Sequence, residues 1–256
     1  MAPFELAEPT SVSEALNLLD SDGARPLSGG TALMLMMKAG VLRPTRLVSL
    51  RRLGLERIEA NGGLHVGAMT TLRALETSSL IKHHLPVLSR ALRTLSNVRV
   101  RNVATVGGAL AHADPHMDLP PLLAALGAKV KVVGAGGERS LAVEDLYSGY
   151  LETTLRPGEL ITHVEIPTMG KRRAAYLKCT TRSADDWPAV GVAVVLGDEQ
   201  RIFVSAATDR PTRVADEASI ESLTIEGDLH GSAEYKKQLL RVYLKRALHE
   251  ARSAVY

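Results

Sequence analysis

Two double-glycine segments carry the residues of this chain that are best suited to chemistry. Residues 27–31 read Leu-Ser-Gly-Gly-Thr and residues 104–108 read Ala-Thr-Val-Gly-Gly; each follows an apolar stretch and precedes a predicted helix. Glycine tolerates positive φ and lets a backbone approach a ligand closely. The N–H groups at a turn or helix start attract phosphate oxygens. One such segment is common in turns, whereas two in one chain indicate a dinucleotide whose two phosphates are held from two sides.

A polar run at residues 112–118 follows the second segment and contains four side chains able to bind a metal ion: His112, Asp114, His116 and Asp118. A helical metal site would use the two histidines four residues apart, but Pro115 lies between them and disfavours that helix. The carboxylates also alternate with the histidines instead of completing one face. We therefore expect no metal site here, and we interpret the run as a polar loop in which Asp118 accepts hydrogen bonds from ribose hydroxyls.

Other patterns indicate no catalytic residue. Residues 134–137 read Gly-Ala-Gly-Gly, but a nicotinamide-nucleotide fingerprint needs a further glycine where Arg139 stands, so a hairpin turn is the better interpretation. No Gly-x-Ser-x-Gly motif occurs, and Cys179 lies in an expected strand, as a buried structural thiol would. Trp187, the single tryptophan, fits either a packing residue or an aromatic face that covers a planar ring.

Composition excludes several classes of function. The 256 residues are 45% apolar with a net charge of +3, which predicts two or three small subdomains. No apolar run reaches the length of a membrane span and the first residues do not resemble a secretion signal, so we expect a cytoplasmic protein. The single cysteine excludes an internal disulfide and a cluster ligated by cysteines of this chain.

Basic residues are dispersed and have few aromatic residues among them, which argues against binding to nucleic acid. One local group of arginines is expected on a solvated or subunit-facing surface: Arg90, Arg93, Arg99 and Arg101.

Local signals place the elements that must position these residues. Ser11 begins a capping box, residues 61–62 (Asn-Gly) mark a hairpin, and Pro86 suits the first turn of a helix. Thr31 and Thr70 are each expected to cap a helix.

The last third of the chain changes character. Three apolar stretches at residues 174–180, 189–196 and 201–208 are expected to form a three-stranded antiparallel sheet. Two helices are expected to follow at residues 212–223 and 233–251 and to cover one face of that sheet. The chain is therefore predicted to be α+β.

Together, three blocks of this sequence resemble the flavoproteins of molybdenum hydroxylases. The first block is Ser-Gly-Gly-Thr at 28–31 with Leu33, Met37 and Lys38. The second is Thr-Val-Gly-Gly at 105–108, followed by residues 110–115 and by Asp-Leu-Pro at 118–120. The third comprises Tyr176, Lys178, Arg182, Asp186 and residues 190–193, and Ala-Glu-Tyr at 233–235 also matches. The similarity extends from about Phe4 to Leu248.

The family is the medium, FAD-binding subunit of carbon monoxide dehydrogenase and of its xanthine and aldehyde dehydrogenase relatives. The resemblance implies an FAD-binding fold of the vanillyl-alcohol-oxidase (PCMH) type, followed by a C-terminal three-stranded antiparallel sheet with helices. It implies two FAD-binding subdomains at residues 1–53 and 54–167, and a C-terminal capping domain at residues 168–256.

The resemblance also implies which residues bind FAD. Most belong to the two glycine segments and their continuations: Leu27, Ser28, Gly29, Gly30, Thr31, Ala32, Leu33, Thr105, Val106, Gly107, Gly108, Ala109, Ala111 and His112. Asp118 would bind the ribose or ribityl hydroxyls, Ile161 and Lys178 match positions that contact the flavin ring, and Trp187 aligns with an aromatic that shields it. Family members usually carry asparagine at position 109, so one side-chain hydrogen bond to FAD is expected to be missing.

As partners, the resemblance implies a large subunit with molybdopterin and a small subunit with two [2Fe-2S] clusters, arranged as a dimer of heterotrimers. The FAD would take electrons from the clusters and pass them to an external acceptor. Two alternatives stay open, a stand-alone FAD oxidoreductase and a non-catalytic assembly subunit with the same fold. Carbon monoxide, a purine, an aldehyde or an N-heteroaromatic compound all fit as the substrate of the complex.

Overall fold

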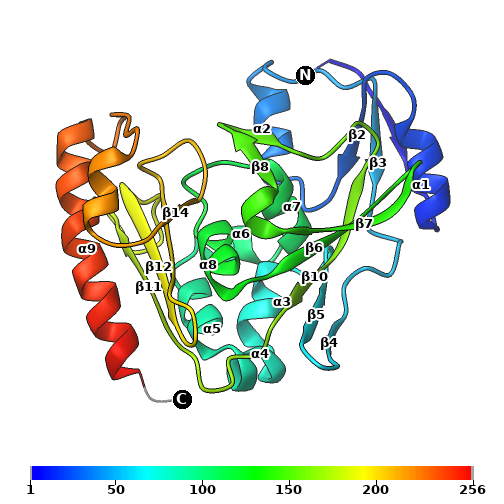
Figure 1. The fold of residues 1–256 in the computed structure, drawn as a ribbon. Coiled ribbons are helices and arrows are strands. Elements are labelled where there is room, and N and C mark those ends of the chain that lie inside the picture. The colour runs from blue at the N-terminus through cyan, green and yellow to red at the C-terminus, as the bar shows by residue number, and fades with distance from the viewer. Residues whose placement is uncertain (1, 255–256) are drawn as a thin grey trace.

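The computed structural model describes residues 2–254 as three consecutive α+β parts (Figure 1). The N-terminal part contains a three-stranded parallel sheet in the order β1-β3-β2. Its elements are β1 (Glu5–Ala7), α1 (Val12–Leu19), β2 (Ala24–Leu27), α2 (Leu33–Lys38) and β3 (Arg46–Ser49). The first glycine segment therefore connects the carboxyl end of β2 to α2, which is where ligands bind in open parallel sheets.

The predicted N-cap residue is confirmed for α1 and is wrong for α2. Ser11 caps α1 by accepting a hydrogen bond from the Glu14 N–H at 3.2 Å, although the Glu14 carboxylate reaches back to the Thr10 N–H rather than to Ser11. Thr31 does not cap α2, because the residue at the N-cap is Ala32 and no side chain bonds there. Likewise Thr71, not Thr70, caps the helix that follows it.

The central part is a five-stranded antiparallel sheet in the order β4-β5-β10-β6-β7. Its strands are β4 (Ile58–Ala60), β5 (Leu64–Gly67), β6 (Lys129–Gly134), β7 (Gly137–Ala142) and β10 (Leu160–Ile166). Both predicted hairpins are confirmed: Gly62 has φ +68° in the turn between β4 and β5, and Gly134 pairs with Gly137.

Six helices of this part lie between β5 and β6 in the chain: α3 (Leu72–Thr77), α4 (Ser79–His84), α5 (Pro86–Leu92), α6 (Val98–Arg101), α7 (Val106–His112) and α8 (Leu119–Leu126). They bury one face of the sheet, as the alternation on β5 shows, where Leu64 and Val66 are buried and His65 is not. After β7 the chain forms a 3-10 turn (Val143–Asp145) and the small strand pair β8 (Tyr147–Gly149) and β9 (Glu152–Thr153).

The C-terminal part differs from its prediction in one strand. Its antiparallel sheet has four strands rather than three: β11 (Arg173–Cys179), β12 (Val190–Leu196), β13 (Arg201–Ser205) and β14 (Thr212–Val214). The helix expected at residues 212–223 is therefore wrong, because this stretch begins with β14 and then forms a 3-10 turn (Ala218–Ser222). The final helix is confirmed as α9 (Ala233–Ser253).

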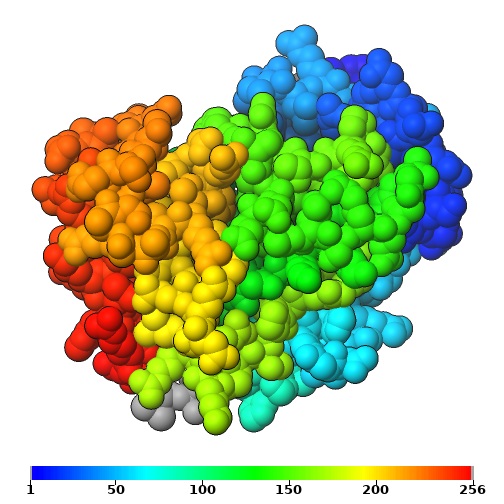
Figure 2. All heavy atoms as spheres, in the orientation of Figure 1, coloured from blue at the N-terminus to red at the C-terminus, as the bar shows by residue number. Residues whose placement is uncertain are grey.

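This sheet is packed on both faces. Helix α9 covers β11 and β12 through Leu240, Leu244 and Ala247, while α8 of the central part lies against β12 and β13 on the other side. Phe203 consequently belongs to the same apolar core as the central helices. Figure 2 shows the C-terminal chain, in yellow to red, packed directly on the central chain in green. Within residues 2–254 no helix has both the length and the apolar character needed to cross a membrane.

One arginine of the expected surface group is buried instead. Arg101 is only 8% exposed; its Nε donates to Glu76 Oε2 at 3.0 Å, and its Nη1 donates to the carbonyl oxygens of Leu95 and Ser96. Arg99, two residues earlier on the same short helix, is exposed. The prediction of a surface position is therefore wrong for Arg101 and correct for Arg99.

Replacing Arg101 by methionine is expected to lower the free energy of unfolding by about 3–5 kcal/mol, because it leaves the Glu76 carboxylate buried without its charged partner. Arg99→Met is the matched control and should change it by less than about 0.5 kcal/mol. Urea denaturation of the two variants measures the difference, and equal losses would contradict a specific role for the Arg101–Glu76 pair.

Candidate functional site

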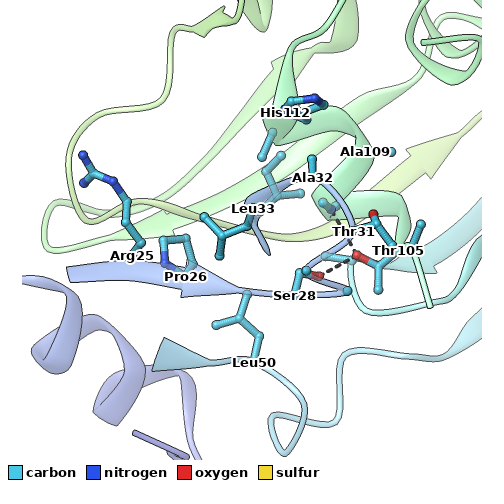
Figure 3. A pocket seen from close by; sticks show the side chains of 18 of the residues that line it. Arg25, Pro26, Ser28, Thr31, Ala32, Leu33, Leu50, Thr105, Ala109 and His112 are labelled. Atoms are coloured by element: carbon cyan, nitrogen blue, oxygen red, sulfur yellow. Dashed lines mark hydrogen bonds between the residues drawn. The ribbon is translucent and has the colours of Figure 1, made fainter. Parts of the chain in front are cut away.

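A cavity of about 370 Å³ lies where the N-terminal and central parts meet. The two glycine segments form one end of its wall, and Figure 3 shows Ser28 and Thr105 facing each other there, with Arg25 at the opposite end. Thirteen predicted binding residues line it: Ser28, Gly29, Gly30, Thr31, Ala32, Leu33, Thr105, Gly107, Gly108, Ala109, Ala111, His112 and Ile161. Leu27, Val106, Asp118, Lys178 and Trp187 are not in the wall.

The first glycine segment presents unused hydrogen-bond donors at this wall. Among the described residues, none accepts a hydrogen bond from the backbone N–H groups of residues 29–32. Gly30 has φ +72°, a left-handed conformation that turns the chain from β2 into α2 and that a side chain would strain. Consecutive amides in such a turn form a concave anion-binding surface. The geometry therefore supports the predicted phosphate site for this segment.

Most backbone N–H groups of the second glycine segment already have acceptors, and among residues 104–108 only that of Thr105 has none within the described chain. The segment lies in the first turn of α7, where Val106 N–H donates to Thr70 O at 3.0 Å and Gly107 N–H to Ala68 O at 2.8 Å. Gly108 N–H donates to Thr105 Oγ1 at 3.1 Å. The second segment therefore offers fewer open amides to an anion than the first, and its contact with the pyrophosphate stays a prediction.

Close packing explains the glycines of the second segment, and one glycine of the first. A Cβ on Gly107 would stand 2.6 Å from Ala68 Cβ, and a Cβ on Gly29 would stand 2.2 Å from the carbonyl oxygen of Val103. The two segments also share a side-chain bond, since Ser28 Oγ lies 2.5 Å from Thr105 Oγ1. These contacts hold the two segments in one rigid wall.

The charge around the cavity is set by three side chains. Arg25 brings a cation to one end, whereas the Glu159 carboxylate is already paired with Arg139 at 2.6 Å. Burial lowers the pKa of His112, and Asp114 only partly offsets this effect. His112 is therefore a neutral imidazole at neutral pH, able to donate or accept one hydrogen bond without adding charge.

Asp118 and Lys178, predicted to bind the cofactor, contact each other instead. Lys178 Nζ donates to Asp118 Oδ2 at 3.0 Å and to the carbonyl oxygens of Thr94 and Asp186 at 2.8 and 3.2 Å. Tyr176 donates its hydroxyl to the other Asp118 oxygen at 2.5 Å. Burial raises the pKa of Asp118, and the Lys178 charge counters that rise. The group joins the central part to β11, and it leaves neither residue with a contact to the cavity.

Trp187 is half-exposed and stacks on His116, with ring centroids 5.6 Å apart and an interplanar angle of 16°. His116 in turn bridges two carboxylates: its Nδ1 lies 3.0 Å from Asp114 Oδ1 and its Nε2 lies 2.9 Å from Asp228 Oδ2. The polar run at residues 112–118 thus connects α7 to the C-terminal part.

The sequence reasoning missed part of the wall. Twelve additional residues line the cavity, several of them from β2, α2 and the segments around β9: Arg25, Pro26, Met36, Leu42, Leu50, Ala68, Ala104, Met117, Leu151, Leu155, Glu159 and Leu160. Arg25 could have been found, because it lies on the strand that leads into the first segment. Leu151 could not, because it reaches the cavity through a turn with φ +57° that no local signal marks.

A turn with open amides in an α+β fold, beside a second close-packed glycine segment, is typical of a protein that binds a phosphate-containing cofactor. Residues 2–169 match the family described as "FAD binding domain in molybdopterin dehydrogenase". The chain therefore belongs to this FAD-binding family, as its resemblance predicted.

Relatives match over nearly the whole chain. The glyceraldehyde dehydrogenase medium chain of Sulfolobus acidocaldarius is 30% identical over 96% of this chain and 98% of its own. The carbon monoxide dehydrogenase medium chain of Afipia carboxidovorans is 31% identical over 98% and 97%. A chain of the crystal structure of Cu,Mo-CO dehydrogenase superimposes with a TM-score of 0.91 at 30% identity, covering 99% of each chain. These matches confirm the predicted fold.

Gly30→Ala is expected to weaken FAD binding at least tenfold, because a side chain at its φ of +72° strains the turn that carries the open amides and also places a Cβ 3.1 Å from Leu27 Cδ1. Gly62→Ala is the matched control: it has nearly the same φ, +68°, but its Cβ meets nothing within 4 Å. Both should lose about 1–2 kcal/mol of stability. Flavin-fluorescence titration separates them, and equal FAD affinities would contradict the phosphate site.

The His116 bridge is expected to stabilise the fold more in acid than in base. Burial lowers the pKa of His116, but the hydrogen bonds and charges of Asp114 and Asp228 outweigh it and hold the pKa above the ordinary value of 6.5. The pKa of Asp228 is lowered to about 2, chiefly because Lys236 and His116 outweigh burial, so this carboxylate stays ionised. The stabilisation is therefore complete below pH 6.5 and is lost as the pH rises through the raised pKa of His116.

Urea denaturation of the protein and of His116→Gln at pH 6 and pH 8.5 measures this effect. The variant should be less stable by about 1.5–3 kcal/mol at pH 6, as expected for hydrogen bonds to charged groups, and by less at pH 8.5. The exposed His83, replaced by glutamine, should show no such difference. A His116→Gln deficit that does not depend on pH would show that the imidazolium charge is unimportant.

Proposed function

We propose that this chain is the FAD-binding, electron-transfer subunit of a molybdenum hydroxylase. In this proposal the FAD takes electrons from [2Fe-2S] clusters of a small partner subunit and passes them to an external acceptor, while a large partner subunit holds molybdopterin. The observation that carries the proposal is the row of unused backbone N–H groups at residues 29–32, in a chain of the FAD-binding family. The medium-chain names of the relatives support an assembly with other subunits.

The chain's own residues supply binding and orientation. The amides of residues 29–32 would donate hydrogen bonds to phosphate oxygens. Arg25 would place a positive charge at the other end of the cavity. Leu33, Leu50 and Ile161 provide apolar wall that excludes water. The neutral His112 offers a hydrogen bond without further charge.

When bound, FAD supplies the redox chemistry, since it accepts electrons one at a time and can release them in pairs. Lys178 was interpreted from the resemblance as a contact to the flavin ring. Because its three N–H donors already have acceptors in Asp118 and two backbone carbonyls, we propose a positioning role for it at the joint with the C-terminal part. The flavin contacts of Trp187 and the domain boundaries near residues 53 and 167 remain part of the proposal.

Substrate choice is proposed to lie outside this chain. The relatives are named for glyceraldehyde, carbon monoxide and nicotine, although their medium chains are about equally similar to this one, at 30 to 32% identity. A subunit that serves such different chemistry is best explained if another subunit binds the substrate. A dimer of heterotrimers is the assembly we propose.

The absorbance spectrum of the purified chain, followed by heat release and chromatography of the flavin, tests the proposal. Flavin bands with about one released FAD per chain are expected; a preparation without flavin should bind FAD on titration. A chain that binds no FAD would favour the assembly-subunit alternative. Turnover of a substrate by this chain alone would favour the stand-alone oxidoreductase.

A further inference from the structure

Two histidines and a glutamate meet on the open face of the central sheet, away from the cavity. His65 lies on β5, and His163 and Glu165 lie on the neighbouring strand β10. The register places Glu165 directly opposite His65, and His163 is two residues further along the same face. All three side chains are partly exposed, whereas their neighbours Leu64, Val66 and Val164 point into the core and are buried.

The three residues bring ligand atoms into one small volume. One nitrogen of each imidazole and one oxygen of the carboxylate all lie within 4.8 Å of one another. His163 Nε2 is 3.6 Å from Glu165 Oε1, and the two imidazole centroids are 6.0 Å apart. Adjacent antiparallel strands fix the backbone positions of all three, so little chain motion is needed to close the ligands on an ion.

Hydrogen bonds at the two rings determine which nitrogen of each neutral imidazole can bind an ion. Thr162 donates its hydroxyl hydrogen to Lys131 O. In the contact between Thr162 Oγ1 and His163 Nδ1 the ring must therefore be the donor. This leaves Nε2 of His163, which faces Glu165, as the free base. His65 Nε2 contacts Asn61 O at 3.2 Å; a carbonyl only accepts, so Nδ1 of that ring is the free base. Partners of this kind are the second layer that orients metal-binding histidines.

We propose that His65, His163 and Glu165 bind one Zn²⁺ ion. Two neutral imidazoles and a carboxylate are a ligand set that zinc accepts, with a fourth position left for water. Lys131, which lies opposite His163 on the neighbouring strand β6, is already paired with Glu138 at 2.9 Å. Lys129 lies opposite Glu165 in the sheet but, within residues 2–254, forms no ion pair with it, so the carboxylate stays available. The proposal is independent of FAD binding.

Isothermal titration of the untagged 256-residue chain with Zn²⁺ tests the site. One ion per chain is expected to bind. His163→Ala and Glu165→Gln should each weaken binding at least tenfold; Glu165→Gln keeps the shape of the side chain and protects the test against misfolding. Thr162→Val should weaken binding about tenfold by releasing the His163 ring, while leaving all three ligands in place. Zn²⁺ should also raise the melting temperature of the protein, because binding favours the folded state.

The adjacent pair His83 and His84 on α4 provides a matched control for adventitious binding, since these rings also touch, with centroids 4.7 Å apart. The double variant His83→Ala/His84→Ala should bind Zn²⁺ as the unmodified chain does. The proposal is overturned if the unmodified chain binds no Zn²⁺, or if Glu165→Gln and His163→Ala bind Zn²⁺ as tightly as the unmodified chain does. It is also overturned if the His83→Ala/His84→Ala variant is the one that loses Zn²⁺ binding.

Discussion

The close approach of two backbones is the constraint on which the rest of this structure depends. Gly29 lies against the Val103 carbonyl and Gly107 lies against Ala68, at separations that leave no room for a Cβ. A hydrogen bond between the side chains of Ser28 and Thr105 also joins the two glycine segments. The Gly29–Val103 and Ser28–Thr105 contacts connect the N-terminal and central parts, so they determine how the two sheets meet, while the Gly107–Ala68 contact fixes the start of α7 within the central part.

The two glycine segments differ in the role of their backbone amides. In the second segment, donation to Thr70, Ala68 and Thr105 uses the amides at the start of α7, so those residues act as a clamp that holds the wall. The first segment is held through Gly29 and Ser28, which leaves the amides of residues 29–32 free of internal acceptors. Because the protein already fixes the direction of these N–H groups, little reorganisation is needed when an anion binds to them.

Local signals in the sequence predicted much of this fold, and long-range contacts account for what they missed. The Ser11 cap and the hairpin at Gly62 depend on residues within a few positions, and both are confirmed. Strand β14 pairs with β13 across a turn, and its short sequence carries no period that separates it from a helix. Arg101 is buried because Glu76 lies beside it in the fold, 25 residues away in the chain. Similarly, the free amides could be expected at either glycine segment until their acceptors were known.

The polar run at residues 112–118 shows that a sequence can place a segment without revealing which residues it contacts. It does follow the cavity wall, but His116 and Asp118 turn toward the C-terminal part, where they contact Asp228, Tyr176 and Lys178. Helix α7 therefore has the cavity at its first turn and this joint directly after its last. Since α7 is only seven residues long, about two helical turns, this joint lies close to the part of the wall that α7 forms. The C-terminal part thus supports the cofactor cavity by fixing α7, without contributing a side chain to the wall.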